Sequence, residues 1–104
     1  MKMSPMLVLL ALLPVVAHAA PDDPRCGSDL TRADGLVSKV AARDRGGPYK
    51  ASAICGVLRE NLRDMREAAD IMKRCMTGHA LRENVGQMEG SMEDVRGAIA
   101  ARCG

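Results

Sequence analysis

The stretch KRCMTGHALRENVGQM, residues 73–88, gathers the side chains of this chain that are best suited to a soft metal ion. It contains a cysteine, two methionines and His79, and Met72 precedes it directly. Thioether sulfur and imidazole nitrogen are ligands that suit Cu(I). Met72, Met76 and His79 are therefore candidate ligands of a copper site close to a helical turn.

The methionines also have a structural explanation, which we favour. Methionine adapts to irregular gaps in a core, and the chain has neither Phe nor Trp to supply other bulky side chains. Five methionines recur at helical spacing on two apolar stripes: Met65, Met72, Met76, Met88 and Met92. We therefore expect core packing and no bound cofactor, and Cu(I) binding stays as the alternative.

The cysteines of the chain number four: Cys26, Cys55, Cys75 and Cys103. An even number in a short exported chain is typical of a pair of disulfides. There is no CxxC motif, which a thioredoxin-like redox function would need, and the cysteines are too widely spread for a compact zinc site. We expect the cysteines to be structural.

Apolar periodicity predicts three helices, which span residues 28–45, 50–77 and 79–103. Ser28 is a good N-cap for the first, and the sequence RGGP at residues 45–48 ends it. The second has an unbroken heptad seam from Cys55 to Met76, and the third continues this pattern after Gly78. Short connections favour an all-α, antiparallel, up-down-up bundle of three helices.

The lengths of the helices decide how the cysteines pair. Cys55 and Cys75 share a helix in which about twenty residues span about 30 Å, whereas a disulfide needs Cα atoms within about 7 Å. A bond from Cys26 to Cys55 would join opposite ends of antiparallel helices. The remaining connectivity is Cys26–Cys75 and Cys55–Cys103.

The helix surfaces carry two further expectations. On the outer face of the second helix, ion pairs are expected four residues apart, at Arg63–Glu67, Arg66–Asp70 and Asp70–Arg74. Three polar residues flank the apolar seams, where half-exposed side chains help to fix helix register: Asn61, Asn84 and Ser91. In the hairpin of the second and third helices, Met65 is expected to face Met92.

The N-terminus has the pattern of a secretory signal, with Lys2 before a short apolar run and small residues at Ala17 and Ala19. We expect a signal peptide at residues 1–19, an extended lead at 20–27 and the helical domain at 28–104. The pattern is typical of a bacterial protein that is periplasmic or secreted. The apolar run is too short for a comfortable membrane span, so we expect no stable membrane insertion after cleavage.

The charge balance and the residue types exclude several functions. Lys and Arg number 15 and Asp and Glu number 13, and Tyr49 is the one aromatic residue, so neither the charge nor the stacking surfaces for nucleic acid are present. No serine or cysteine has an identifiable base beside it in sequence. We expect a protein that is not an enzyme.

The remaining hypothesis is a protein that acts by binding an unidentified protein partner, as a binding, stress or chaperone-like module. Gly86, Gly90 and Gly97 fall off the apolar seam of the third helix and suggest an outward strip where a partner's backbone could approach closely. The alternatives are a Cu(I) carrier and a secreted effector or inhibitor.

Overall fold

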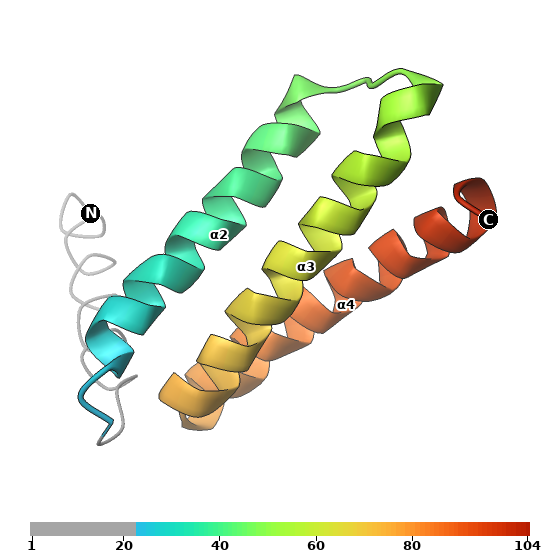
Figure 1. Cartoon of the computed structure of the whole chain (residues 1–104). Helices are drawn as coiled ribbons and strands as arrows, with labels where there is room; N and C mark the ends of the chain where they lie inside the picture. Colours follow the sequence, from blue (N-terminus) through green and yellow to red (C-terminus); the bar gives the residue numbers. More distant parts are fainter. Residues whose placement is uncertain (1–22) are drawn as a thin grey trace, which may run out of the picture.

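The computed structural model describes residues 23–104, which form helices α2 (Cys26–Gly46), α3 (Ala51–Cys75) and α4 (Gly78–Arg102). Figure 1 shows them running up, down and up, with α3 between the other two. Residues 23–104 contain no strand. The all-α, antiparallel architecture is confirmed, while the expected signal peptide and the start of the lead lie outside the described residues.

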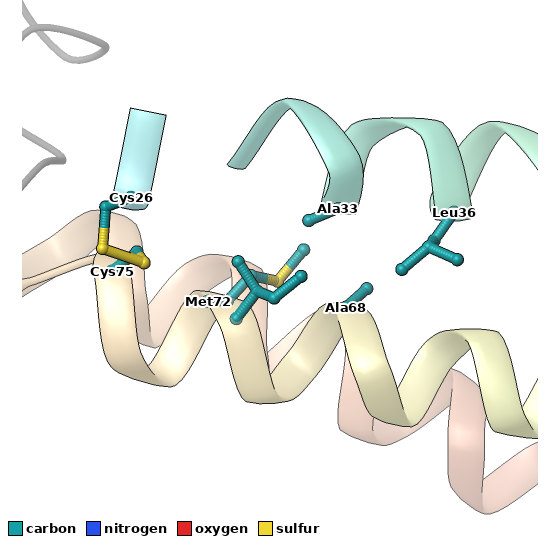
Figure 2. Packing of buried hydrophobic residues seen from close by; sticks show 7 residues of the cluster. Cys26, Ala33, Leu36, Ala68, Met72 and Cys75 are labelled. Atoms are coloured by element: carbon teal, nitrogen blue, oxygen red, sulfur yellow. A yellow bond between two sulfur atoms is a disulfide. The ribbon is translucent and has the colours of Figure 1, made fainter. Parts of the chain in front are cut away.

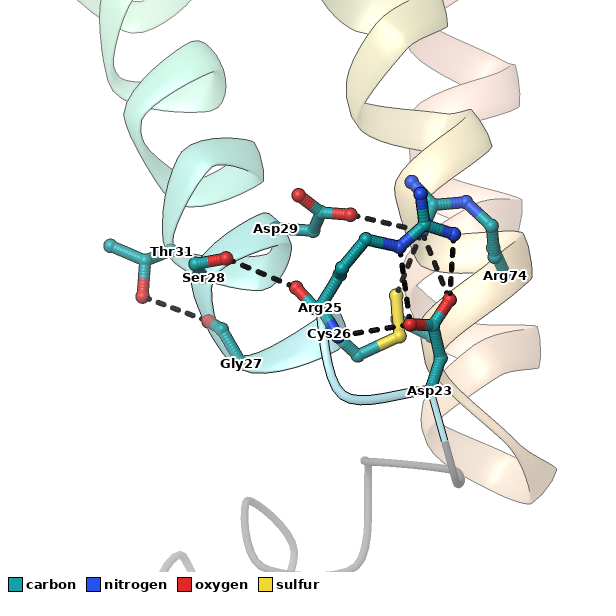
Figure 3. The surroundings of a disulfide bond; sticks show 9 residues. Asp23, Arg25, Cys26, Gly27, Ser28, Asp29, Thr31 and Arg74 are labelled. Carbon is teal, nitrogen blue, oxygen red and sulfur yellow. Dashed lines mark hydrogen bonds and ion pairs between the residues drawn. A yellow bond between two sulfur atoms is a disulfide. The ribbon is translucent and has the colours of Figure 1, made fainter.

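The start of α2 differs from the expected N-cap at Ser28. Asp23 caps the first turn, because its Oδ1 accepts a 2.9 Å hydrogen bond from the backbone N–H of Arg25. Its carbonyl accepts a 3.1 Å bond from the N–H of Cys26. Pro24 follows the capping residue, where proline is favoured because its missing N–H is not needed. The hydroxyl of Ser28 instead donates to the carbonyl of Arg25 (Figure 3).

The connection between α2 and α3 depends on a close approach of Tyr49 to the end of α2. The hydroxyl of Tyr49 donates a 2.6 Å hydrogen bond to the carbonyl of Arg43. A Cβ at Gly46 would lie 2.9 Å from that hydroxyl oxygen, so only glycine fits there without rearrangement. Between α3 and α4, Gly78 has φ +61°, a left-handed conformation that glycine adopts without strain.

The core is built around α3, which packs against α2 on one side and α4 on the other. One buried cluster joins α2 to α3, and Figure 2 shows its members Cys26, Ala33, Leu36, Ala68, Met72 and Cys75. The other cluster consists of Val40, Leu62, Met65, Ala69 and Met92. Met65 and Met92 share this cluster, as the expected hairpin register requires.

Both expected disulfides are present. Cys26–Cys75 joins α2 to α3 with Cα atoms 5.4 Å apart, and Cys55–Cys103 joins α3 to the residue after α4 with Cα atoms 5.8 Å apart. They lie at opposite ends of α3 and close loops of 49 and 48 residues in sequence separation. In the chain-entropy model each is worth about 4 kcal/mol, which is comparable to the whole stability of a small domain.

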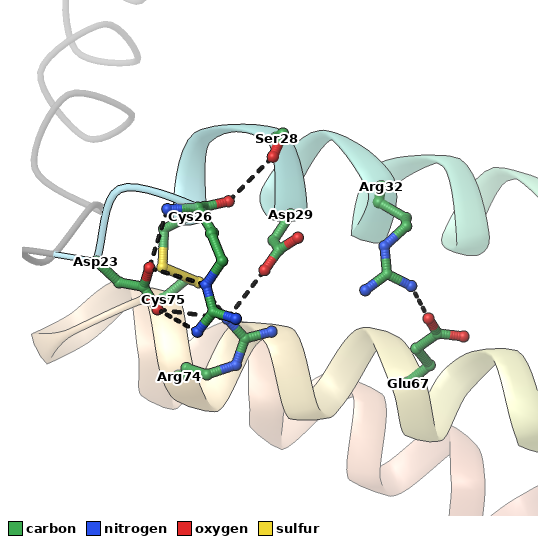
Figure 4. A network of polar contacts seen from close by, with 9 residues as sticks. Asp23, Cys26, Ser28, Asp29, Arg32, Glu67, Arg74 and Cys75 are labelled. Atoms are coloured by element: carbon green, nitrogen blue, oxygen red, sulfur yellow. Dashed lines mark hydrogen bonds and ion pairs between the residues drawn. A yellow bond between two sulfur atoms is a disulfide. The ribbon is translucent and has the colours of Figure 1, made fainter.

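The expected ion pairs within α3 are not formed among residues 23–104; the acidic and basic side chains pair mainly between helices instead. Arg74 lies 2.9 Å from Asp29 of α2, and Glu67 pairs with Arg32 of α2, as Figure 4 shows. Arg63 pairs one turn back with Glu60. The prediction was wrong because spacing along one helix says nothing about charges that a neighbouring helix brings closer.

Candidate functional site

A groove runs between α2 and α4, above α3. It exists because α2 and α4 each pack along α3 and touch each other little. The groove has a volume of about 570 Å³. It is lined by Asp34, Val37 and Ser38 of α2, by Met72 of α3, and by Asn84, Gln87, Met88 and Ser91 of α4.

The lining of this α2–α4 groove combines apolar side chains with polar walls, in which Asp34 is the one charged residue. Val37, which is 38 % exposed, is the exposed large hydrophobic residue of the described chain. Met72 lines the same groove, is only 6 % exposed and belongs to the core. Asn84 donates its amide to the carbonyl of Ala80 at 2.8 Å, which leaves its side-chain oxygen as an acceptor. The groove therefore offers apolar contact and hydrogen bonds together.

Asp34 is the one ionisable side chain in the lining of the α2–α4 groove. The lining residues include no histidine, lysine or arginine, and the described residues contain no free cysteine. The hydroxyls of Ser38 and Ser91 therefore have no imidazole or amine beside them in the groove to act as a general base.

A second groove, between α3 and α4, is smaller and differently composed. Its volume is about 270 Å³ and its lining is mostly charged. Lys73 lies 3.3 Å from Glu89, and Arg96 lies 3.4 Å from Glu93. Because these charges already have partners within the chain, they have less to gain from a ligand.

Asn61 has a different position from the one expected. It is 2 % exposed, so it is buried and not half-exposed. Its Oδ1 accepts a 2.8 Å hydrogen bond from Arg43 of α2, and its amide lies 3.4 Å from Oδ1 of Asp44. Asn61 thus joins α3 to α2, which agrees with the expected effect on helix register. Of the other two polar residues, Asn84 is half-buried and Ser91 is exposed, and both line the α2–α4 groove.

Gly86, Gly90 and Gly97 lie on the exposed surface of α4. A Cβ added to Gly86, Gly90 or Gly97 would meet no atom within 4 Å. None of them lines the α2–α4 groove. The outward strip therefore exists, on a different face from the groove, and its use by a partner stays a prediction.

The candidate copper ligands have different surroundings. Met72 is in the core, Met76 is partly buried against the same cluster, and His79 is exposed in the first turn of α4. Within residues 23–104, no three or more His, Cys, Asp or Glu side chains are grouped so that they could hold a metal ion. Cu(I) binding through thioethers stays a prediction.

Asp23 and Arg25, just before α2, shift each other's pKa because each stabilises the charge of the other. The side-chain hydrogen bond from Arg25 lowers the pKa of Asp23, and the backbone N–H of Arg25 lowers it further. In Figure 3 the same carboxylate also faces Arg74, beside the Cys26–Cys75 disulfide. These charges hold the start of α2 against the end of α3.

Sequence reasoning singled out four of the lining residues for other reasons, but did not predict the groove: Met72, Asn84, Met88 and Ser91. A signal was present in α4, where residues 84, 87, 88 and 91 are uncharged although the rest of the helix surface is rich in charge. No helix of residues 23–104 is both long enough and apolar enough to cross a membrane. Comparison with protein-family models, curated proteins and solved structures finds no match.

Proposed function

We propose that this chain is an exported, non-enzymatic protein that binds another protein in the α2–α4 groove. The observation that carries this proposal is the exposure of Val37 in a groove that it shares with amide, hydroxyl and carboxylate side chains. An apolar floor with a polar rim is the usual composition of a protein-binding surface. Such a protein works as a binding, stress or chaperone-like module.

The compartment supports this proposal. Two disulfides in a chain of this size indicate an oxidising compartment. Together with the signal pattern of residues 1–19, they favour the periplasm or the extracellular space.

The two disulfides also support binding because they hold the groove in one shape. Cys26–Cys75 fixes α2 to α3 at one end, and Cys55–Cys103 fixes α4 to α3 at the other. The two walls of the groove are thus both anchored to its floor. A surface that is already ordered loses less conformational entropy on binding, which favours affinity.

Photo-crosslinking in the producing cell tests this function. A photoreactive residue replaces Val37 or Gln87 in the groove, and in matched controls it replaces Gly90 on the outward strip or Lys39, an exposed residue of α2 outside the groove lining. We expect a discrete protein adduct from positions 37 and 87 and none from the controls. Adducts from position 90 alone would show that the partner binds the glycine strip and not the groove. The absence of adducts at all positions would overturn the proposal.

A secreted effector or inhibitor shares the features of the proposed protein, and the same experiment separates the two. For a partner in the same cell, adducts form in a pure culture of the producing cell. For an effector, the groove positions give adducts only after the secreted protein is mixed with target cells. The second result would show that the partner belongs to another cell, with the α2–α4 groove still as the binding surface.

A further inference from the structure

The margins of the α2–α4 groove point to the chemistry of its partner: we infer that the groove takes a basic amphipathic helix that runs in the same direction as α3. This inference rests on the proposed function and adds the class and the orientation of the partner. It is carried by the topology of the three helices, by the charges along the groove and by the apolar contacts at its floor.

The topology gives the direction. Helices α2 and α4 run the same way, antiparallel to α3 (Figure 1), and the lining residues place the groove between α2 and α4. In an up-down-up-down bundle each helix is antiparallel to its two neighbours. A fourth helix in the open corner has α2 and α4 as neighbours, so it runs antiparallel to both and parallel to α3.

The one charged residue of the groove lining is acidic, and two further acidic residues of α4 lie on a ridge that continues beyond the lining. Asp34 lines the wall on α2. On α4, residues 83, 87 and 91 follow each other at intervals of four and residue 94 follows three later, so Glu83 and Asp94 extend the ridge of Gln87 and Ser91.

These carboxylates are free to pair with a partner. Within the described part of the chain, Asp34, Glu83 and Asp94 form no ion pair, whereas in the α3–α4 groove Lys73 pairs with Glu89 and Arg96 pairs with Glu93. The formal net charge of the chain is +2, so the acidic margin is a local feature and not a consequence of composition. Unpaired carboxylates along a binding groove favour a partner that carries Lys or Arg.

The floor of the groove determines the other face of the partner. Val37, Met72 and Met88 offer apolar contact from three different helices. A helix that docks in such a groove presents apolar anchors three, four and seven residues apart. The partner is therefore amphipathic, with an apolar seam on the floor and basic residues that reach the two walls.

A second copy of this chain fits the groove poorly. Val37 is the exposed large hydrophobic residue of residues 23–104, and it belongs to the groove itself. Two copies that face each other with their grooves would each lack an apolar ridge to insert. The occupant is thus a helix of another protein.

The test uses two synthetic helical peptides of about twenty residues, long enough to span about 30 Å. Both have a leucine seam, which is flanked by lysine in one peptide and by glutamate in the other. With the oxidised protein at low salt, we expect the lysine peptide to bind about tenfold more tightly, since exposed ion pairs each contribute a modest amount. High salt should remove most of this difference. Equal affinities would overturn the charge assignment.

Variants separate the groove from the rest of the surface. Asp34→Lys should lower the affinity for the lysine peptide by about threefold to tenfold. Asp70→Lys is the matched control, since Asp70 is an exposed acidic residue that lines the α3–α4 groove, and it should leave the affinity unchanged. Val37→Ser should lower the affinity for both peptides because it removes apolar contact without adding charge. Equal effects of the two lysine variants would overturn binding in the α2–α4 groove.

The orientation is tested with a spin label at the N-terminus of the lysine peptide. A helix parallel to α3 brings this label to the end of α2 near Ala42, and resonances there should broaden. Broadening near Thr31 would overturn the orientation. If neither peptide binds while Val37 gives a crosslinked adduct in the cell, the basic-helix inference fails and the proposed function stands. Self-association through the groove in sedimentation would also overturn the inference.

Discussion

Arg43 of α2 donates a 2.8 Å hydrogen bond to the side-chain oxygen of Asn61, which is buried on α3. The same guanidinium lies 2.9 Å from Oδ2 of Asp64, a carboxylate that is 8 % exposed. That oxygen accepts no well-oriented hydrogen bond, so the ion pair with Arg43 is its main compensation. One arginine thus fixes how α2 lies on α3 near the loop end of both helices.

Removing this arginine should leave a buried charge without its partner. We expect Arg43→Met to lower the free energy of unfolding by about 3 kcal/mol, since breaking a buried ion pair on one side is costly. The double variant Arg43→Met with Asp64→Leu should recover much of that loss because both charges are then removed. Urea unfolding of the oxidised protein measures these differences.

The control for this cycle is Arg63→Met. Arg63 lies 3.9 Å from Glu60 on the surface, and exposed pairs contribute little. Arg63→Met should lower the free energy of unfolding by less than about 0.5 kcal/mol. A loss for Arg43→Met as small as that of Arg63→Met would contradict the stabilising effect of the buried pair.

The two disulfides should differ in their reduction. Cys26 and Cys75 are fully buried, whereas Cys55 and Cys103 are partly exposed. Thiol–disulfide exchange needs access for the attacking thiolate, so a small thiol should reduce Cys55–Cys103 first. Alkylation and peptide mapping at increasing times should show labels at residues 55 and 103 before residues 26 and 75. The reverse order would contradict the protection of Cys26–Cys75 by burial.

The three glycines in the interior of α4, unlike Gly78 at its start, should be replaceable by alanine. Because an added Cβ meets nothing within 4 Å, Gly86→Ala, Gly90→Ala and Gly97→Ala should each raise stability by up to about 1 kcal/mol. Gly46→Ala is the contrasting variant. It should lower stability, because the added Cβ would lie 2.9 Å from the hydroxyl of Tyr49. Urea midpoints compare the four. Destabilisation by the α4 variants would show a contact that this structure does not contain.

Asp23 should make stability depend on pH at the acidic end. Its pKa is lowered in the folded state, chiefly by the hydrogen bond from Arg25. A lowered pKa means that the stabilisation is present above the carboxyl's ordinary pKa and is lost as pH falls through the folded value. The difference in Tm between the natural protein and Asp23→Asn should be constant near neutrality and shrink below about pH 4. A difference that persists unchanged at lower pH would contradict ionisation as its cause.

Cu(I) should bind weakly or not at all. Met72 is 6 % exposed within a packed cluster. Its sulfur is therefore poorly accessible to a metal ion bound at His79. Titration against a chelating competitor measures the affinity, with His79→Ala and Met76→Leu as controls. Met76→Leu nearly conserves volume and should cost less than about 1.5 kcal/mol. Tight binding that either substitution abolishes would establish the copper site.

The sequence by itself determined the three helices, the apolar seams and the disulfide pairing. Each follows from local periodicity or from the length of a helix: the seam of α3 shows in the spacing from Cys55 to Met76, and the separation of Cys55 from Cys75 excludes a bond between them. The bounds of the helices were predicted to within two residues. The start of α2 was missed because the capping signal of Asp23 and Pro24 was not recognised.

Only the tertiary structure decided what lies between the helices. The pairing of Arg74 with Asp29, the burial of Asn61 and the α2–α4 groove all depend on how α2 and α4 are placed around α3. The apolar stripe of α4 is narrow, and Met92 is its one buried residue. Most of this stripe packs on α3; Val85 and Met88 reach the cluster between α2 and α3, but α4 contacts α2 little. Periodicity shows which face of a helix is apolar, but the angle between two helices that share a neighbour is set by side-chain packing in three dimensions.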